Sequence, residues 1–568
     1  MNFVPMTLKM NRQSWLIFGL ILILTVYQVV RLIVFANVYG GIEEDSGWYS
    51  SIARSLAERG TYTTMTSTIV DPTAPAGINI HEHFDIQDQE GRIWFFTVNW
   101  VGPGSIVPNA MILKLFGVNF WSLKAGALLF YSLFLLLASF LIYSVGGIIP
   151  VVLFHLFFVF YPHLVVYLGY EPFAEMPTMV YILLAYLLFV KAIQAKQHQV
   201  AWFFLCGLCG GLTLVTKLTG LLPLSSLFVL WFLEFRRGNA TLKQLAVLGC
   251  GLVSLPLLWE IIQFLTIVQL TNFETYQLHA AERISFFEDE SHTGGESFVT
   301  TNFGEFTLAK LLIFSQVSHP HPILGVVMFG LIIASGPVLV YLRSKELIAN
   351  RIILLFWFGW LTHSLWFLGI SKTAWIRRDW FALVLGIALF CWLVGYFIQR
   401  ARRKPAWHNL TAAILLVLLT LINFSGQRQA MGWFIPDSLV ETWRLNFLAN
   451  DTLAGKYEQR MPWIIIPRAQ QEEVIEYLRQ LPAAGKIFYA GNLKVAELPV
   501  IVGRIFYPIQ RRPFMPHGDE DVVVIGSRAF SPWRRPQALI EPIKQEIKSQ
   551  CPQLLLENDY YIICSVTD

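Results

Sequence analysis

The dominant pattern in the sequence is a series of long apolar runs separated by short polar segments. A helix needs about 20 apolar residues to cross the hydrocarbon core of a bilayer. Runs of this kind lie near 14–36, 122–144, 147–165, 173–193, 201–218, 220–235, 242–268, 322–342, 352–370, 375–398 and 408–424. The pattern therefore predicts a polytopic α-helical membrane protein with about 11 spans.

After residue 424 the pattern changes to short segments of mixed character. EEVIEYLRQL at 472–481 has apolar residues at helical spacing, which predicts an amphipathic helix. KIFYA at 486–490, DVVVIG at 521–526 and YYIICSV at 560–566 are apolar runs of the length and composition typical of strands. We therefore predict a transmembrane domain over 1–424 and a small α/β domain over 425–568.

A polar stretch follows the first apolar run and reads EEDSGWYSSIARSLAERG, residues 43–60. Its apolar residues recur at helical spacing, which predicts an amphipathic helix along the membrane surface. Three carboxylates, those of Glu43, Glu44 and Asp45, stand at its start. Taken alone, the pattern also fits a solvated helix start, because Asp and Ser favour the N-cap and negative charge suits that end of a helix.

The composition supports a membrane protein and excludes two other classes. Of 568 residues, 55% are hydrophobic and only 14% are charged, which is unlike a soluble globular protein. The formal net charge is only +4, so we expect no nucleic-acid partner. The partner that the composition predicts is a lipid bilayer.

The positions of the basic residues predict the orientation in the membrane, because cytoplasmic loops carry an excess of Lys and Arg. When the runs are taken as alternating spans, basic residues gather on one side, at Lys9, Arg12, Lys191, Lys196, Arg236, Arg237, Lys243, Arg343, Lys345, Arg351, Arg400, Arg402, Arg403 and Lys404. The N-terminus is therefore predicted to be cytoplasmic, and the loop at 37–121 and the C-terminal domain extracytoplasmic. We expect a multi-pass protein of the bacterial inner (plasma) membrane rather than of the endoplasmic reticulum.

Two carboxylates on the predicted outer side are candidates for function, since ionisable groups at a membrane boundary are costly without a partner or a task. In YEPFAEMP, Glu171 and Glu175 are four residues apart and share a helix face if the helix begins early enough. Pro172 and Pro177 indicate the irregular backbone that often lines a cavity. The alternative is a structural acid at the end of a span.

Cations lie on the same predicted side. Lys217 stands in LTLVTKLTG, and Lys372, Arg377 and Arg378 stand in ISKTAWIRRDW. Arginines close to a lysine can bind a phosphate through several charged hydrogen bonds. The alternative is that they anchor spans by snorkelling, which suits Lys372 well. Carboxylates and phosphate-binding cations on one face together predict a lipid substrate whose phosphate lies at headgroup level.

Histidines and cysteines add weaker signals. HEHFD contains His81 and His83, and a His-x-His pair can bind a divalent metal. No third ligand is defined, so we expect no obligatory cofactor and keep dependence on a divalent metal as an open question; histidines of a loop without metal are the alternative. Cys551 and Cys564 lie in the polar tail and can pair if that tail faces an oxidising compartment.

The stretch DSGWYSSIARSLAERGTY resembles the first-loop signature of the GT-C glycosyltransferase superfamily, in particular of its dolichyl-phosphate-mannose–protein mannosyltransferase and lipid A aminoarabinose transferase-like group. In that signature an acidic residue precedes a Tyr and an IA-x-x-L-x-x-x-G helix, which here gives Asp45, Tyr49 and residues 52–60. WVGPGSIVPNAMILKLFG is similar to the group's Pro-Gly segment, although the usual Pro-Pro pair is reduced to Pro103-Gly104.

Three later segments extend the resemblance over roughly residues 15–400, in patches. AEMPTMVYILLAYLLF resembles the segment with the second acidic residue, which falls on Glu175. GLCGGLTLVTKLTGLLPL matches the Gly-rich span with its lysine, Lys217. RRDWFALVLG resembles the late Arg-Tyr element, but Asp379 follows the arginines where an aromatic residue is usual, so either Arg377 or Arg378 holds the family's place.

The resemblance implies a GT-C-like fold with an outer-face cavity beneath two juxtamembrane helices. It implies a sugar donor linked to a polyprenyl phosphate and a lipid, glycan or protein acceptor. Asp45 would be the general base of an inverting single displacement, with Glu44 as the reserve candidate, and Glu175 would position the acceptor or the sugar. Lys217 and one of the two arginines would stabilise the departing phosphate.

The remaining candidates, Tyr49, Glu171 and Lys372, are expected to contact substrate. Other classes of function stay as alternatives. A ligase or polymerase could use a lipid-linked oligosaccharide on the same fold. A transporter or flippase is disfavoured because no pair of inverted halves is evident. A non-catalytic scaffold leaves the cations on the predicted outer side unexplained.

Overall fold

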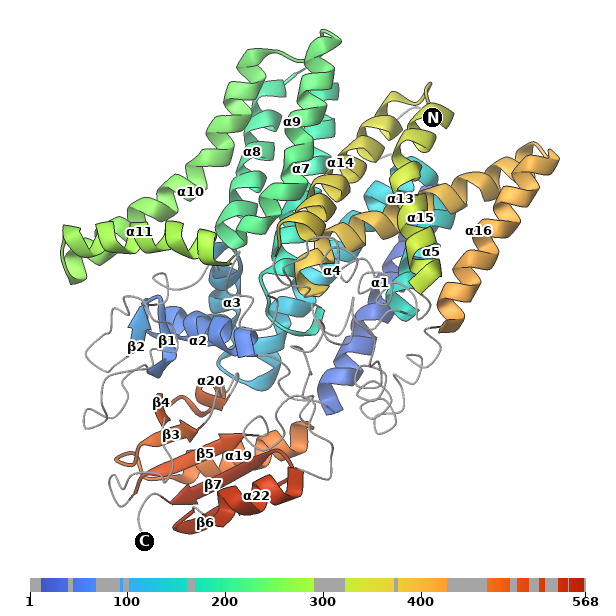
Figure 1. The fold of residues 1–568 in the computed structure, drawn as a ribbon. Helices are drawn as coiled ribbons and strands as arrows, with labels where there is room; N and C mark the ends of the chain where they lie inside the picture. Colours follow the sequence, from blue (N-terminus) through green and yellow to red (C-terminus); the bar gives the residue numbers. More distant parts are fainter. Residues whose placement is uncertain are drawn as a thin grey trace.

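A computed structural model describes residues 12–38, 44–67, 92–94, 102–160, 169–195, 197–290, 322–371, 376–426, 467–490, 498–509, 520–526, 540–549 and 551–565. The molecule has two parts, a bundle of long helices and a smaller sheet domain at one end of it (Figure 1). This arrangement confirms the predicted class, a helical membrane protein with a small C-terminal α/β part.

The bundle follows the apolar runs of the sequence. Its helices are α1 (Arg12–Val38), α4 (Phe120–Gly146), α5 (Ile148–Phe160), α7 (Glu175–Gln194), α8 (Gln199–Thr216), α9 (Leu221–Arg236), α10 (Leu242–Leu270), α13 (Pro322–Leu342), α14 (Leu347–Gly369), α15 (Ile376–Arg403) and α16 (Trp407–Gly426). Among the described residues, 8 helices are long and apolar enough to cross a membrane. Shorter apolar helices at Ile148–Val159, Val326–Leu342 and Trp407–Ile422 coincide with the other predicted runs.

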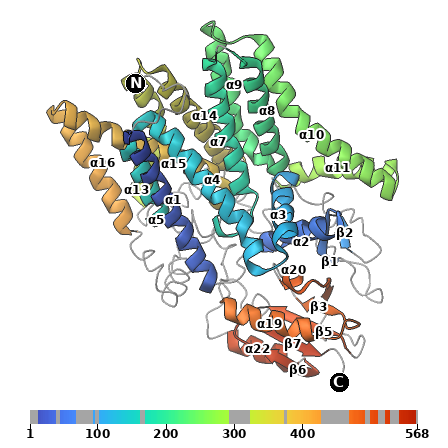
Figure 2. The same ribbon diagram turned by 180° about the vertical axis from the view of Figure 1, so that it is seen from behind.

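α15 is the centre of the bundle, and it is buried along most of its length. Trp380 and Trp392 on this helix are almost fully buried. The indole Nε1 of Trp392 donates to the carbonyl oxygen of Ile142 on α4 over 3.0 Å. A buried indole needs such a partner, so this bond fixes α15 against α4. α15 also packs on α5, and Figure 2 shows α1 and α4 in front of α15.

A buried arginine inside the first span also has a structural explanation. Arg31 of α1 is 4% exposed, and its guanidinium donates to the carbonyl oxygens of Phe158 and Val159. These carbonyls belong to the last turn of α5, which has no intrahelical partners for them. A cation at the C-terminal end of a helix also complements the helix dipole, so Arg31 caps the short helix α5.

Two shorter helices lie between the bundle and the sheet domain. α2 (Glu44–Arg59) carries the amphipathic pattern predicted from the sequence, and α3 (Pro103–Phe116) begins with Pro103, which suits the first turn of a helix. They pack against each other, as the two juxtamembrane helices implied by the family resemblance would. α11 (Phe273–Glu290) runs back from the end of α10.

The sheet domain contains the helices α19 (Arg468–Gln480), α20 (Leu498–Val502) and α22 (Ile540–Ser549). Its strands are β3 (Ile487–Ala490), β4 (Phe506–Ile509), β5 (Val522–Gly526), β6 (Gln553–Glu557) and β7 (Tyr561–Ser565). The helix over 472–481 and the strands over 486–490, 521–526 and 560–566 were all predicted and are confirmed. β3 pairs in parallel with β4 and β5, and β7 and β6 follow as antiparallel strands.

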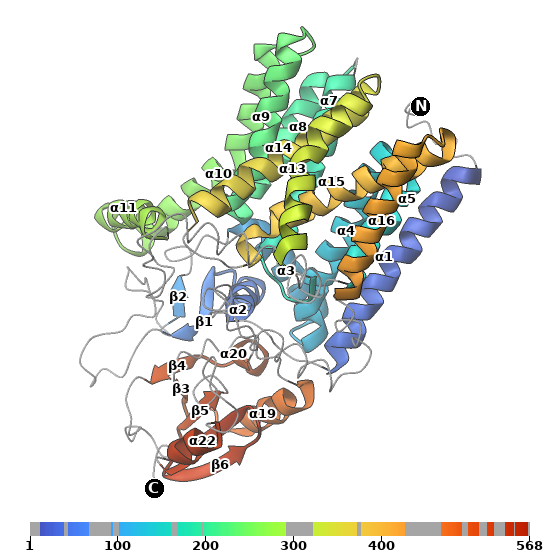
Figure 3. The same cartoon turned by 45° about the vertical axis from the view of Figure 1, so that its right-hand side comes forward.

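The first loop contributes to this same sheet. β1 (Thr63–Ser67) and β2 (Arg92–Trp94) pair with each other, and Thr66 of β1 pairs in parallel with Phe506 of β4. The strand order is β2-β1-β4-β3-β5-β7-β6, so residues from both ends of the chain form one sheet (Figure 3). In addition, Arg54 of α2 donates to the carbonyl oxygen of Val500 on α20.

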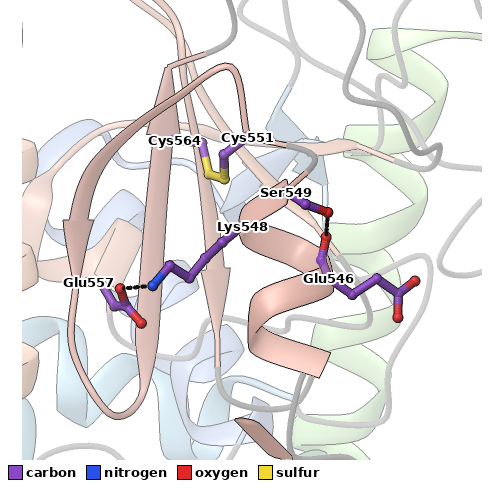
Figure 4. Close-up of a disulfide and its surroundings, with 6 residues drawn as sticks. All are labelled: Glu546, Lys548, Ser549, Cys551, Glu557 and Cys564. Atoms are coloured by element: carbon purple, nitrogen blue, oxygen red, sulfur yellow. Dashed lines mark hydrogen bonds and ion pairs between the residues drawn. A yellow bond between two sulfur atoms is a disulfide. The ribbon is translucent and has the colours of Figure 1, made fainter. Parts of the chain in front are cut away.

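The two cysteines of the tail form a disulfide. Cys551 precedes β6 and Cys564 lies in β7, and their Cα atoms are 5.6 Å apart, within the usual range for a disulfide. Figure 4 shows the bond beside the ion pair of Lys548 with Glu557, whose charged atoms are 2.7 Å apart. The pairing, which the sequence left open, therefore links β7 to the segment between α22 and β6.

Candidate functional site

The centre of the candidate site is an ion pair between Glu175 and Lys217. Nζ of Lys217 lies 2.5 Å from Oε1 of Glu175, and the two side chains are 17% and 1% exposed. Glu175 is the first residue of α7, and Lys217 follows the last residue of α8 in extended conformation. Two residues that the sequence singled out separately, 42 positions apart, are thus direct partners.

The Pro-Gly segment explains how α3 reaches this pair. A Cβ at Gly102 would lie 1.8 Å from the carbonyl oxygen of Val215, and one at Gly104 would lie 2.0 Å from Oγ1 of Thr216. Only glycine permits so close an approach of two backbones. The start of α3 therefore packs directly on the last turn of α8, next to Lys217. The hydroxyl of Tyr181 on α7 donates to the carbonyl oxygen of Gly104 over 2.8 Å and joins the three elements.

α2 meets the same region through Tyr49. This side chain is 3% exposed, and its ring lies edge-on to the ring of Phe173, with centroids 6.4 Å apart. Glu44 and Asp45 are the first two residues of α2, while the positions of their carboxylates, and Glu43, lie outside the described residues. The predicted role of Asp45 as general base therefore stays a prediction. The structure shows that α2, which begins at these carboxylates, packs next to residues 170–175.

Glu171 has a partner that the sequence did not suggest. Its Oε1 lies 2.9 Å from Nζ of Lys124, and both side chains are 0% exposed. Lys124 lies in the apolar run FWSLKAGALLF, at the beginning of α4. The one available signal was a lysine inside a predicted span, which is costly unless it is paired. The predicted contact of Glu171 with substrate stays a prediction.

The segment RRDWFALVLG, with its two arginines, lies at the start of α15. Arg377 and Arg378 lie in the first turn of this helix, where the backbone N–H groups and the helix dipole favour an anion. Their side chains, and Lys372, lie outside the described residues. Asp379 in the same turn is 4% exposed. The backbone positions of the two arginines are therefore consistent with the predicted phosphate site, and the geometry of that site stays a prediction.

The metal candidates are not resolved by the structure. Among the described residues, no group of three His, Cys, Asp or Glu side chains is arranged to hold a metal ion. His81 and His83 lie outside those residues.

Comparison with solved structures finds proteins of similar fold, whereas comparison by sequence finds no matching family. No family model matches the chain, and no curated protein matches its sequence. The crystal structure of ArnT from Cupriavidus metallidurans in the apo state matches with a TM-score of 0.51 and 12% identity, over 97% of this chain and 98% of that chain. The structure of the same protein bound to undecaprenyl phosphate matches with a TM-score of 0.52 and 14% identity, over the same shares. The chain has the GT-C fold.

An oligosaccharyltransferase from Archaeoglobus fulgidus, in complex with Zn and sulfate, also matches, with a TM-score of 0.48 and 13% identity over 89% of this chain and 68% of that chain. The two ArnT matches confirm the GT-C resemblance, predicted from the first loop and the Lys217 span, at the level of the fold. Identities of 12–14% are too low to transfer a substrate, so the chemistry has to be argued from the site.

Proposed function

We propose that this chain is a membrane glycosyltransferase that moves a sugar from a polyprenyl-phosphate-linked donor to a lipid, glycan or protein acceptor on the extracytoplasmic face. The observation that carries the proposal is the GT-C fold, shared with ArnT over 97% of this chain. The ArnT structure with undecaprenyl phosphate supports a polyprenyl phosphate as the lipid carrier.

Lys217 is proposed to bind the phosphate of the donor. Its ammonium group is held by Glu175, and its side chain keeps 17% exposure while that of Glu175 is almost fully buried. A pair of this kind orients the lysine before the substrate arrives, which reduces the ordering that binding requires. As the bond from sugar to phosphate breaks, negative charge grows on the phosphate, and a preorganised cation stabilises it.

Arg377 and Arg378 are proposed to complete the phosphate site. They begin α15, where the positive end of the helix dipole adds to their own charge. An arginine can hold two phosphate oxygens at once, which suits a leaving group whose position must be fixed.

Asp45 is proposed to accept the proton of the acceptor hydroxyl as that oxygen attacks the anomeric carbon. The bond to the lipid phosphate breaks in the same step, so the configuration inverts. The first turn of α2 suits a carboxylate because it is the positive end of a helix. Packing of Tyr49 on Phe173 joins α2 to the segment that ends at Glu175, which is proposed to position the sugar or the acceptor.

The test is transfer by the purified protein with a polyprenyl-monophosphate-linked sugar in excess. We expect polyprenyl monophosphate to be released with each transfer. Asp45→Asn keeps the size and capping ability of the side chain but removes the basic oxygen, so turnover should fall about 10²–10⁴-fold. Thermal stability should stay near that of the wild type.

Matched variants and alternative products make this test specific. Glu43→Gln should be mild, and Glu44→Gln shows whether the base is one position away. Full activity of Asp45→Asn would remove Asp45 from the mechanism. No transfer from this donor, together with release of polyprenyl diphosphate when a diphosphate-linked oligosaccharide is supplied instead, would indicate an oligosaccharide ligase or polymerase. Movement of the lipid between the two leaflets of a vesicle membrane, without any transfer of the sugar, would indicate a flippase.

A further inference from the structure

The ion pair of Lys124 and Glu171 is unusual because both side chains are completely buried. Each is 0% exposed, and Nζ of Lys124 lies 2.9 Å from Oε1 of Glu171. Removing two charges from water is expensive, and good geometry with further contacts is needed to offset that cost. A second contact is present, since Nζ of Lys124 lies 4.2 Å from the centroid of the Tyr170 ring, within the range of a cation–π interaction.

Lys124 lies near the start of α4, where several contacts hold the helix in place. Asn119 and Ser122 form a capping box at the start of α4, with each side chain bonded to the backbone N–H of the other. Arg468 of the sheet domain lies over the Phe120 ring, with its Cζ 4.3 Å from the centroid. The turn that carries Lys124 is therefore fixed from within α4 and from the sheet domain.

Glu171 lies in a segment without regular secondary structure. Residues 171–174 are not helical, and Pro172 has no N–H to donate. Yet every residue from 170 to 180 is buried. One backbone hydrogen bond lies within it, from Phe173 N–H to the carbonyl oxygen of Glu171, so side-chain contacts must supply most of what fixes this segment. Lys124 fixes its beginning through Glu171, and Lys217 fixes its end through Glu175.

We infer that Lys124 is a positioning residue, which holds Glu171 and thereby sets Glu175 and the Phe173 surface on which Tyr49 packs. This inference rests on the proposed function and assigns Glu171 to the support of the site. Because Lys124 is fully buried, it acts through the segment 170–175. A displacement of about 1 Å near a reacting centre can cost about 100-fold in rate, so loss of this anchor lowers kcat more than it raises KM.

The test variant is the double substitution Lys124→Met with Glu171→Gln, which removes both charges and keeps the side-chain sizes. Removing both charges of a buried ion pair is less destabilising than removing one, because a single substitution leaves an uncompensated buried charge. We expect thermal stability near wild type, kcat lowered about 10–100-fold and KM for the donor changed less than about threefold. Each single variant should be less stable than the double variant.

The matched control is a second buried pair far from α2. Glu234 of α9 accepts from Arg351 of α14 in two parallel hydrogen bonds of 3.1 and 2.6 Å. The double substitution Glu234→Gln with Arg351→Met removes this charge pair and keeps a side-chain oxygen for Arg237 and Asn239, which also donate to Glu234. It should leave kcat within about threefold of the wild type. The exchanged pair, Lys124→Glu with Glu171→Lys, should recover activity relative to either single variant.

Hydrogen–deuterium exchange of the peptide over 170–180, without substrate, separates this inference from the proposed function. Exchange should increase in the Lys124→Met, Glu171→Gln variant and not in the control. Unchanged exchange or unchanged kcat would overturn the positioning role. A raised KM with unchanged kcat would overturn it in favour of direct contact between Glu171 and the donor. An inactive wild type with increased exchange in the variant would refute the proposed function alone.

Discussion

A single lysine can serve a membrane protein in two ways, and the two lysines paired at this site illustrate the difference. Lys124 is fully buried with Glu171, whereas the side chain of Lys217 keeps 17% exposure beside Glu175. A charged group that remains accessible can replace part of its ion-pair interaction by a contact with a ligand. A charged group that is fully buried with its partner cannot. The accessible lysine is therefore the one proposed for binding, and the sealed one for support.

The cations proposed to bind phosphate can be tested together. Arg377→Gln with Arg378→Gln retains some hydrogen bonding but no charge, so affinity for the polyprenyl phosphate should fall at least about tenfold, with the fold intact. Lys217→Met should act in the same direction. The measurement is binding of a polyprenyl phosphate to the purified protein. Unchanged binding in both variants would make these residues interfacial anchors.

Single residues also show where sequence reasoning ends. Asp45, Glu175 and Lys217 are marked by short motifs, but nothing local in the sequence indicates that Glu175 and Lys217 are partners. Lys124 and Arg31 both lie inside predicted spans. A charge in an apolar run signals a buried partner, yet only the packing of α1 on α5, and of α4 on the segment before α7, shows which carbonyl or carboxylate that partner is.

At the scale of elements, the local pattern predicted helices well and strand pairing poorly. The spans, β3, β5 and β7 follow from apolar runs in the sequence, and α19 follows from helical periodicity. β4 contains Pro508, a residue that weakens any prediction of a strand because it cannot donate to the ladder. β1 depends on pairing with β4, far along the chain, and β2 depends on pairing with β1; no local pattern records these pairings. The sheet was therefore predicted in part and its edge was missed.

The packing of α3 on α8 gives a prediction at this scale. In Gly104→Ala the new methyl group would lie 2.0 Å from Oγ1 of Thr216, so either the Thr216 side chain must turn or α3 must move away from α8. We expect a loss of about 1–3 kcal/mol in stability together with reduced transfer, because the same turn leads into Lys217. Thermal unfolding in detergent and the transfer assay measure the two effects.

Gly249→Ala is the matched control for this change. Gly249 lies in α10, and an added Cβ there would meet nothing within 4 Å. Alanine favours a helix over glycine by about 1 kcal/mol, so this variant should be as stable as the wild type or slightly more stable. Equal behaviour of the two alanine variants would show that the close approach at Gly104 does not matter.

At the scale of the whole molecule, the two regions predicted to share one side of the membrane lie at one end of the bundle. α2 and the sheet domain are together, while the turn between α9 and α10 lies at the opposite end (Figure 1). That turn follows the basic residues Arg236 and Arg237, which predict a cytoplasmic position. The Cys551–Cys564 bond fits an oxidising compartment for the sheet domain.

Topology is therefore a prediction for the complete protein. A reporter fused after Asp568 should be active outside the cytoplasm, and one inserted near Arg402 should be active inside it. In intact cells, Cys551 and Cys564 should resist alkylation until a reductant is added. A cytoplasmic C-terminus would put the sheet domain and the proposed donor on opposite sides of the membrane and exclude the proposed site.

The sheet that joins the first loop to the tail also constrains how the protein is made. Arg54 contacts Val500, a residue 446 positions later in the chain. At about 5–20 residues per second, the ribosome needs roughly 20–90 s to synthesise that interval. If the first loop is translocated as the basic residues predict, the edge of β1 that pairs with β4 is open to other strands during this time. The hairpin of β1 and β2 must therefore persist, or be protected by a chaperone, until the last segment of the chain arrives to complete its sheet.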